Sequence, residues 1–345
     1  MKPNLRKHLV AILAGLLIAI PQAAASARNV DCDNGDSLAN ALTSGLGSAA
    51  TLEINLIGTC HGDFTINRDR VRVLGDHNAS IVGSIRVFGS DNVAFRDLTI
   101  TGPGDGLLIF NSRVRLIDVR VTANEGTGIS LDESGALQMT RGEVNANAEF
   151  GVQARGSHAK FFDTQIVGNS AIGIRATGGS SLHIEGGAVS NSGIHGIEMM
   201  FNSALFLWHT ELSNNGAVEG YGAMLTMGSS GELHFATIKE NSGEGVEAIG
   251  NSAVEINGGV IHSNLHHGVS LGLGSVADLV GGVQIFGNGA DGVFLDAASG
   301  LWVRDNSSIP PNGSGWSVGC NGDESSVAVF DPAFVPAIGC TDPDF

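Results

Sequence analysis

A repeated segment of 22 to 26 residues is the feature that most constrains how this chain can fold. The pattern is first complete at residues 124–131, Asn-Glu-Gly-Thr-Gly-Ile-Ser-Leu, and it returns seven more times. Successive motif glycines, from Gly106 to Gly292, are separated by 22, 23, 22, 23, 26, 23, 23 and 24 residues. The repeated asparagines are Asn124, Asn147, Asn169, Asn191, Asn215, Asn241, Asn264 and Asn288. A period of this length predicts a solenoid in which each repeat forms one coil.

Each repeat is expected to contain three short strands. In the repeat that begins at Gly173, the alternation of residues predicts strands at 174–176, 182–184 and 188–189, with the middle residue of a triplet pointing outward. One coil cannot bury its own interior, so each strand should pair in parallel with its equivalent in the next coil. The asparagine is interpreted as a structural ladder in the turn, because side-chain amides can bond their neighbours there.

The alternation is ambiguous at one lysine. Aligning Lys160 with Leu182 would place a charge in the core. We therefore expect a local shift that puts Phe161 inside and Lys160 outside. Before the regular repeats, further strands are expected at 52–57, 64–66, 71–74, 85–88 and 93–95.

The first residues have the features of a secretory signal peptide. Lys2, Arg6 and Lys7 precede an apolar run over residues 9–20, and the small residues 25–27 form an expected cleavage site. The apolar run is about 12 residues long, too short to span a bilayer. The sequence therefore predicts an exported protein without a membrane span, which is periplasmic, secreted or on the cell surface. The mature protein is expected to begin at Arg28.

The ends of the solenoid are expected to be closed by caps and disulfides. Cys32 and Cys60 precede the repeats and Cys320 and Cys340 follow them, so we predict the two local bridges Cys32–Cys60 and Cys320–Cys340. A helix over residues 36–47, with its apolar residues on one face, should cover the first coil. The predicted domains are a signal peptide (1–27), an N-terminal cap (28–63), a β-helix (64–316) and a C-terminal cap (317–345).

The motif Asn-x-x-x-Gly-(Ile/Val)-x-(Leu/Ala), together with the capping helix, resembles the right-handed parallel β-helix of the pectin-lyase-like superfamily over roughly residues 50–315. The resemblance implies an all-β fold. It also implies either a polysaccharide lyase, hydrolase or uronan epimerase, or a non-catalytic adhesin-like or structural protein. The chain lacks the Asp-Asp and Arg-x-Lys motifs of polygalacturonases and the Asp-Pro-His-Asp signature of mannuronan epimerases.

The charge of the chain restricts its partners. Without the three basic residues of the signal peptide, 15 basic residues remain against 35 acidic ones, a net charge of −20. Such a surface repels nucleic acid and anionic membranes. An anionic polysaccharide is also disfavoured unless a local basic patch or bridging cations reverse the field, and the charge could equally serve solubility alone. We therefore expect a monomer that binds no nucleic acid and whose partner, if it has one, is a polysaccharide.

The register of the repeats brings candidate functional residues into columns. The position before the motif glycine contains His195, Tyr221, Glu244 and His267, the position two after it contains Gln153, Arg175, Glu198 and Glu247, and the next outward column contains Arg155. Glu198 and Glu247 should lie about 10 Å apart at the backbone, near the carboxyl separation of inverting glycosidases. The longest coil carries the chain's only tyrosine, between the His195 and Glu244 positions.

These columns yield the site hypothesis. The candidate catalytic residues are Glu198, Glu247, Glu244, His195 and Tyr221, and the candidate substrate-binding residues are Arg175, Arg155, Gln153 and His267. The alternative is that polar residues beside a turn glycine are an ordinary solvated surface. A metal site formed by His262, His266 and His267 is a weaker hypothesis, so neither a metal nor another cofactor is predicted.

Two classes of function remain open from the sequence. One is an exported enzyme acting on a polysaccharide along the stacked strands, with a slight preference for a neutral glycan. The other is a non-catalytic β-helix that binds a glycan or a protein, or acts as a spacer. Carbohydrate sites usually contain aromatic platforms, and the chain has few candidates, namely Trp208, Trp302, Trp316 and Tyr221.

Overall fold

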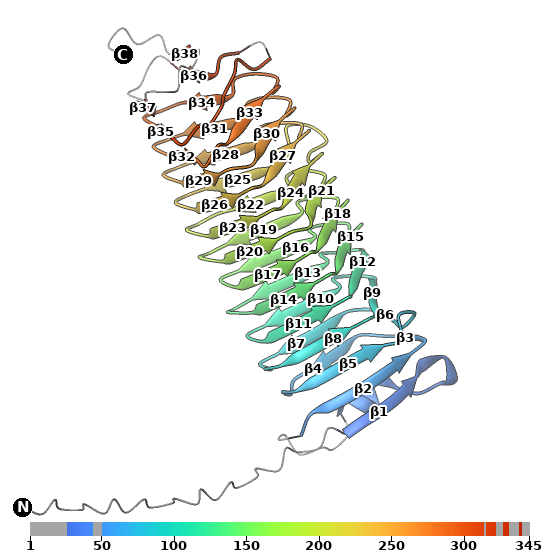
Figure 1. Ribbon diagram of the computed structural model, residues 1–345. Coiled ribbons are helices and arrows are strands. Elements are labelled where there is room, and N and C mark those ends of the chain that lie inside the picture. The colour runs from blue at the N-terminus through green and yellow to red at the C-terminus, as the bar shows by residue number, and fades with distance from the viewer. Residues whose placement is uncertain (1–25, 44–49, 314, 322–326, 331–337, 340–345) are drawn as a thin grey trace, which may run out of the picture.

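The computed structural model describes residues 26–43, 50–313, 315–321, 327–330 and 338–339, which form one elongated stack of coils (Figure 1). In these residues the strands belong to three sheets that run along the stack, named sheets A, B and C here. From β2 to β34 each coil contributes one strand to sheet A, then one to sheet B, then one to sheet C. All strand pairs are parallel, as the repeat predicts.

Sheet A has 14 strands in the described residues: β1 (Ser26–Asp31), β2 (Leu52–Ile57), β5 (Val71–Gly75), β8 (Val93–Arg96), β11 (Arg113–Ile117), β14 (Ala136–Thr140), β17 (His158–Phe162), β20 (Ser181–Glu185), β23 (Ala204–Trp208), β26 (Ser230–His234), β29 (Ala253–Asn257), β32 (Val276–Val280), β35 (Gly300–Val303) and β37 (Val327–Phe330).

Sheet B has 11 strands in the same part of the chain: β3 (Thr59–His61), β6 (Ser80–Val82), β9 (Thr99–Gly102), β12 (Arg120–Asn124), β15 (Glu143–Asn145), β18 (Gln165–Val167), β21 (Ala188–Ser190), β24 (Glu211–Ser213), β27 (Thr237–Lys239), β30 (Val260–His262) and β33 (Gln284–Phe286).

Sheet C has 13 described strands: β4 (Phe64–Ile66), β7 (Ile85–Phe88), β10 (Leu107–Phe110), β13 (Ile129–Asp132), β16 (Val152–Arg155), β19 (Ile174–Thr177), β22 (Ile197–Met199), β25 (Ala223–Thr226), β28 (Val246–Ile249), β31 (Val269–Gly272), β34 (Val293–Leu295), β36 (Val318–Cys320) and β38 (Ile338–Gly339).

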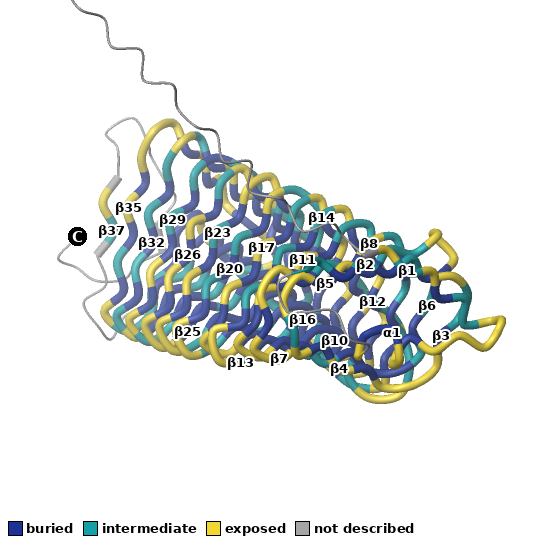
Figure 2. The backbone as a smooth tube through the Cα atoms, turned by 90° about the horizontal axis from the view of Figure 1, so that it is seen from below, coloured by how far each residue is buried: buried dark blue, intermediate teal, exposed yellow. Residues whose placement is uncertain are grey.

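The core is a column of apolar side chains enclosed by the three sheets. In β19, Ile174 and Ala176 are fully buried while Arg175 between them points outward, as the alternation predicts. Figure 2 shows the same pattern along the stack, with buried residues in the strands and exposed residues gathered along the turns. The expected shift at Lys160 is confirmed, because Phe161 is buried and Lys160 is exposed.

The asparagine ladder is confirmed, with one member displaced. Between Asn241 and Asn264, for example, the Nδ2 group of Asn241 donates to Oδ1 of Asn264 over 2.8 Å, and the backbone N–H of Asn241 donates to the same oxygen over 3.1 Å. The amide of Asn264 in turn donates to the Ile238 carbonyl. Each buried amide therefore satisfies backbone groups that the turn would otherwise leave unpaired.

The prediction that Asn191 belongs to the ladder is wrong. The ladder position in that coil is occupied by Ser192, which is buried, whereas Asn191 is exposed with a φ of 54°. The core residue three positions before the ladder is Val189 rather than Ala188. Valine buries more apolar surface than alanine. Because Val189 occupies the core position, the turn that follows lies one residue later in the sequence than predicted.

The repeated glycine is required by space rather than by its backbone angles. A Cβ atom at Gly196 would lie 2.6 Å from the Gly222 carbonyl oxygen and 2.8 Å from the Asn215 amide nitrogen. The same clash recurs along the column, so a side chain here would force adjacent coils apart. The glycine and the asparagine are therefore two parts of one turn.

The N-terminal end is closed as predicted by a short helix and a disulfide. Helix α1 (Leu38–Thr43) buries Leu38, Ala41 and Leu42, and the 3₁₀ helix η1 (Cys32–Asn34) precedes it. Cys32 is bonded to Cys60 across a Cα separation of 5.2 Å. Cys340 lies outside the described residues, so the second bridge remains a prediction.

Strand pairing continues on both sides of the predicted domain boundaries. Strand β1 pairs with β2 inside residues 28–63, and β36 and β37 extend sheets C and A beyond residue 316. The limits of the two caps therefore remain a prediction. The predicted signal peptide lies almost entirely outside the described residues, and the described part contains no helix long and apolar enough to cross a membrane.

Candidate functional site

The predicted column on sheet C exists. Parallel pairing places Gln153 opposite Arg175, Arg175 opposite Glu198, Glu198 opposite Met224 and Met224 opposite Glu247. The turn residues that precede the motif glycines form a second column beside it, since their carbonyl oxygens accept from the glycine of the previous coil. We call the following residues the sheet C cluster: Arg175, His195, Glu198, Tyr221, Glu244 and Glu247.

Arg175 and Glu198 form the most buried ion pair of this cluster. The Arg175 Nε atom lies 2.9 Å from Glu198 Oε2, and the Glu198 side chain is only 12% exposed. The Arg175 guanidinium also lies over the ring of Phe150, 5.6 Å from its centre. Burial raises the pKa of Glu198 and the positive charge of Arg175 opposes that rise. Glu198 is thus an outward-facing but poorly solvated carboxylate whose counter-ion is Arg175.

His195 is held in one tautomer by the backbone. Its Nδ1 atom accepts a hydrogen bond from the Tyr221 N–H over 3.2 Å, so the proton of the neutral ring is on Nε2. Burial lowers the pKa of His195 to about 4, and the ring is therefore neutral at pH 7. In this state Nε2 can donate a hydrogen bond to a ligand but cannot accept a proton from one.

Tyr221 stacks on His195 with 4.7 Å between ring centres and a 6° angle between their planes. Burial, together with the negative charges of Glu247, Glu244 and Glu219, raises its pKa to about 12. The phenol is therefore a hydrogen-bond donor at neutral pH and a poor base. The inserted loop of the longest coil presents this ring beside the acidic residues, as the sequence predicts.

Glu247 is the titratable group of the cluster whose pKa approaches neutrality. Burial, with a smaller contribution from the charge of Glu244, raises the pKa of Glu247 to about 7. Among the described residues no hydrogen bond or ion pair to its carboxyl is shown. Met224 lies between Glu247 and Glu198 in the strand order, which separates the two carboxyls by two coils, about 10 Å at the backbone.

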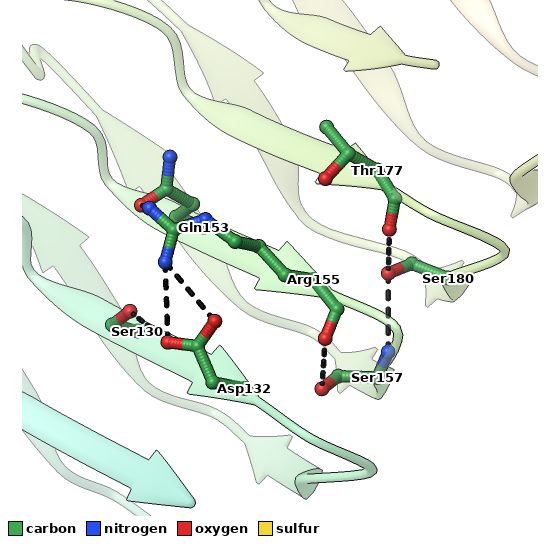
Figure 3. Close-up of polar contacts among 7 residues, drawn as sticks. All are labelled: Ser130, Asp132, Gln153, Arg155, Ser157, Thr177 and Ser180. Carbon is green, nitrogen blue, oxygen red and sulfur yellow. Dashed lines mark hydrogen bonds and ion pairs between the residues drawn. The ribbon is translucent and has the colours of Figure 1, made fainter. Parts of the chain in front are cut away.

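The remaining predicted binding residues are already engaged. Arg155 forms an ion pair with Asp132 over 3.0 Å, each at the last residue of its strand in sheet C, and Arg155 also contacts Gln153 (Figure 3). His267 accepts from the Asp291 N–H and stacks on Phe294 with 4.6 Å between ring centres. Ser130, which the alternation places outside, is only 7% exposed and contacts Asp132. These residues are therefore engaged in contacts within the protein.

The histidines considered for a metal lie in separate contacts. His262 stacks on Phe286, His266 lies 3.6 Å from Glu244, and His267 bonds the next coil as described. Within the described ranges, no three His, Cys, Asp or Glu side chains are placed to share a metal ion.

An aromatic row on sheet A was missed by sequence reasoning. It consists of Phe162, His183, Phe206, Trp208 and His234, which point outward from the neighbouring strands β17, β20, β23 and β26. His183 stacks on Phe206 with 4.6 Å between centres, and His234 lies 5.2 Å from Phe206 and 5.6 Å from Trp208. Counting only Trp and Tyr concealed it, whereas aligning phenylalanine and histidine on the strand register would have revealed it.

Three of the hollows on the surface of the described residues are well defined. One of about 430 Å³ lies on sheet B around Asp118 and Arg141, which form a two-point ion pair. Another of about 350 Å³ lies on sheet A around Arg115 and Lys160, and a third lies around Asp91. None of these three is lined by the sheet C cluster.

The comparisons with known proteins bear on the fold. Residues 151–308 match the protein family described as a right handed β-helix region. The A-module of the mannuronan C-5 epimerase AlgE6 of Azotobacter vinelandii is similar, with a TM-score of 0.58, 17% identity and coverage of 86% of this chain and 93% of that chain. The chain therefore has the fold of a right-handed parallel β-helix.

Two further solved structures share this β-helix at low sequence identity. The catalytic unit of a GH87 α-1,3-glucanase from Streptomyces thermodiastaticus strain HF3-3 has a TM-score of 0.55 and 11% identity, covering 85% of this chain and 62% of that one. The A-module of the epimerase AlgE4 of Azotobacter vinelandii has a TM-score of 0.50 and 14% identity, covering 85% and 91%. No curated protein matches the chain. At these identities the likeness establishes the β-helix fold and no activity.

Proposed function

We propose that this β-helix binds a polysaccharide along the outer face of sheet A. The observation that carries the proposal is the aromatic row, in which rings from four consecutive coils contact one another in stacked or tilted pairs with centres 4.6 to 5.8 Å apart. The faces of sugar rings carry C–H groups that pack on aromatic faces, while their hydroxyls need polar partners at the edges. A row of rings and histidines supplies both.

The spacing of the coils suits a chain of sugars. Successive strands of a sheet lie about 4.8 Å apart, close to the length of one sugar unit, so a glycan lying along the axis meets an equivalent position in each coil. Trp208 is 36% exposed and is held by Phe206 and His234, so its position is largely fixed before a ligand arrives. A preformed platform reduces the entropy lost on binding.

Two other observations support this proposal. The similar structures include proteins named as a mannuronan C-5 epimerase and an α-1,3-glucanase, both of which act on polysaccharides. The Cys32–Cys60 disulfide agrees with export, since such bonds persist in oxidising compartments. An exported protein meets polysaccharides of cell walls and capsules. The absent Asp-Pro-His-Asp signature gives no support to mannuronan epimerisation in particular.

Replacement of Trp208 tests the proposed binding face. Trp208→Ala should weaken binding to the best oligosaccharide of a panel by about tenfold or more, because it removes the largest ring of the row. Trp316→Ala is the matched control, since Trp316 is 52% exposed and precedes sheet C instead of lying on sheet A. Titrations of both variants against the same ligand would show the difference, and equal losses would exclude sheet A as the binding face.

A second candidate function is acid–base catalysis at the sheet C cluster. The observation that favours it is Glu247, whose pKa of about 7 keeps a proton available near neutral pH, beside the ion-paired Glu198. In such a reaction Glu247 would donate a proton to a leaving oxygen, and Glu198 would accept one from water. His195 and Tyr221 would act as hydrogen-bond donors, which favours hydrolysis over proton abstraction by tyrosine.

Single glutamine substitutions test this catalytic hypothesis on whichever glycan is degraded. Glu247→Gln and Glu198→Gln should each lower turnover at least about 100-fold while leaving binding on sheet A intact. Glu240→Gln, at an exposed turn position, serves as the control. Near-normal turnover in both cluster variants would remove the sheet C cluster as a catalytic site.

A further inference from the structure

The hollow on sheet A next to the aromatic row has an unusual charge for this protein. It measures about 350 Å³ and lies over strands β8, β11, β14 and β17. Its basic or imidazole side chains are Arg113, Arg115, His158 and Lys160, and no aspartate or glutamate lines it. In a chain with 35 acidic and 18 basic residues, a hollow without any acid is a local reversal of the overall field.

Two of these cations have no partner. Arg113 pairs with Asp91 over 3.2 Å. For Arg115 and Lys160 no hydrogen bond or ion pair is shown, and they are the two Lys or Arg side chains of the described residues for which this holds. Both line the same hollow. Since carboxylates are abundant on this surface, two neighbouring cations left without one are available to an external anion.

The strand register fixes how these groups face a ligand. Arg115 lies opposite Gln138, and Gln138 opposite Lys160, so the two cations flank an amide at steps of about 4.8 Å. Lys160 in turn lies opposite His183, the second member of the aromatic row. The hollow and the aromatic row are therefore consecutive parts of one track along sheet A.

Along the aromatic row and beyond it the charge on this track changes sign, beginning with the exposed Glu185, which lies between Phe162 and Trp208 in the register. Glu232, Glu255 and Asp278 lie opposite one another in consecutive coils, at the positions that follow Phe206. A ligand charged on every sugar would gain at Arg115 and Lys160 and be repelled at Glu232 and Glu255, whereas the charge of Asp278 is balanced by Arg304. The track therefore suits a ligand whose negative charge is confined to one end of the bound stretch.

We propose that the hollow of Arg115, Gln138 and Lys160 binds a single acidic group, a carboxylate or a sulfate ester, of a sparsely charged polysaccharide whose neutral sugars lie on the aromatic row. This inference rests on the proposed function and adds the class of substrate to it. It also revises the preference for a neutral glycan drawn from net charge alone, because the local field at the hollow is opposite to that of the whole protein. A nucleic acid or a homopolymer of uronate would meet the carboxylates of the same track.

The test compares four oligosaccharides, each with a backbone of four sugars, by calorimetric titration against the mature protein. The probes are xylotetraose, xylotetraose carrying one glucuronate, xylotetraose carrying one sulfate ester, and tetragalacturonate. We expect at least one singly acidic probe to bind about tenfold or more tightly than xylotetraose and than tetragalacturonate, with an advantage that shrinks in 0.5 M salt. The two singly acidic probes distinguish a carboxylate from a sulfate ligand.

The double variant Arg115→Gln/Lys160→Gln should abolish that advantage and leave xylotetraose binding unchanged. Its control is Arg120→Gln/Lys239→Gln, which removes the same charges from ion-paired positions on sheet B. Equal binding of neutral and singly acidic probes by the wild type would overturn the inference and leave the proposed function standing. Loss of the advantage in both double variants would also overturn it, since a general charge effect would then explain the data.

A separate measurement decides the case in which no oligosaccharide binds and the proposed function fails. Lys160 and Lys239 are the only lysines after the predicted signal peptide, so acetylation by a reactive ester can be followed at both by peptide mass spectrometry. Sodium sulfate should slow acetylation of Lys160 at least about threefold relative to Lys239, because a bound anion holds the ammonium group. Equal rates at the two lysines would overturn the anion site itself.

Discussion

Glu247 places a carboxyl on the outside of the β-helix in surroundings that favour its neutral form. Its pKa of about 7 lies above the usual value of 4.5, so the folded protein binds a proton that the unfolded chain releases between these two values. The favourable neutral state is fully present below pH 4.5, and stability is lost as the pH rises through 7. Above pH 7 the fold contains an ionised carboxylate near Glu244 and Tyr221.

Glu247→Gln should therefore stabilise the protein at pH 8 and have little effect at pH 5. The expected gain at pH 8 is about 1–3 kcal/mol, because glutamine keeps the shape and removes the buried charge. Denaturant unfolding of both proteins at the two pH values measures it. His195 contributes an opposite slope, since its pKa is lowered, but it is present in both proteins and cancels in the difference. A gain that is independent of pH would contradict the assignment.

For single residues, the sequence indicates which of them share a column but not the tautomer or the ion-pair partner of each. Strand register alone places Glu198, Met224 and Glu247 in a row, and the structure confirms that order. The tautomer of His195 depends on a backbone N–H from the next coil, which no pattern of residue types reveals. The missing partners of Arg115 and Lys160 likewise depend on where carboxylates in other coils point.

The asparagine ladder is the element that joins the coils, and it is interrupted once. No side-chain bond joins Asn169 to Ser192, and the Ser192 hydroxyl is buried without a hydrogen-bond partner. On both sides of this step the asparagines bond each other, as between Asn147 and Asn169 and between Asn215 and Asn241. A buried hydroxyl without a partner costs stability that a fitting amide would restore.

Ser192→Asn should complete the ladder and stabilise the protein by about 1–2 kcal/mol, because the new amide can bond Asn169 and Asn215 in the same way as the other members. Thermal unfolding of the variant measures the gain. Asn264→Ser, which creates the same interruption elsewhere, should destabilise by a similar amount. If both changes destabilise, the site at Ser192 is shaped for serine and not for the ladder.

A charge introduced at an inward-facing strand position should affect stability far more than one introduced at an outward-facing position. Ala176→Asp should destabilise the protein by more than about 3 kcal/mol, because Ala176 is fully buried in β19 and the carboxylate would have no partner. Ala253→Asp, at an exposed position of β29, should change stability by less than about 0.5 kcal/mol. Chemical denaturation of the two variants gives the comparison, and similar losses would refute the register.

Most of the elements are predictable from the sequence because the period and the alternation repeat many times. Strands expected at 52–57, 64–66 and 85–88 coincide with β2, β4 and β7. The prediction fails at Asn191 because it relies on the recurrence of asparagine, whereas core packing decides the register. Val189 takes the core position in place of Ala188. The sequence predicts the turn of this coil correctly, but the ladder position is Ser192, one residue after Asn191.

For the whole molecule, each coil touches only its neighbours, so local changes should remain local. Strand β1 and helix α1 cover the first coils, and the Cys32–Cys60 bond closes a segment with a sequence separation of 28. Stability of such a stack is the sum of coil and interface contributions. The N-terminal end can therefore loosen while the middle remains folded.

Cys32→Ala/Cys60→Ala should lower the stability of the N-terminal coils by about 3 kcal/mol through the lost loop constraint. Amide hydrogen exchange should become faster in β1 and β2 and remain unchanged in β23, β26 and β29, many coils away. Mass spectrometry of peptides from the exchanging protein measures this. Uniformly faster exchange would mean that the β-helix unfolds as one cooperative unit.

The interrupted ladder also leaves one step of the ladder weaker than the others under tension. A force along the axis is carried from coil to coil by strand hydrogen bonds and by the asparagine side chains, and the side-chain link is absent between Asn169 and Ser192. That joint lies between β17 and β20, so it separates Lys160 from His183. A glycan bound to both would bridge the joint, and the ligand itself would act as a mechanical splint across the interrupted step of the ladder.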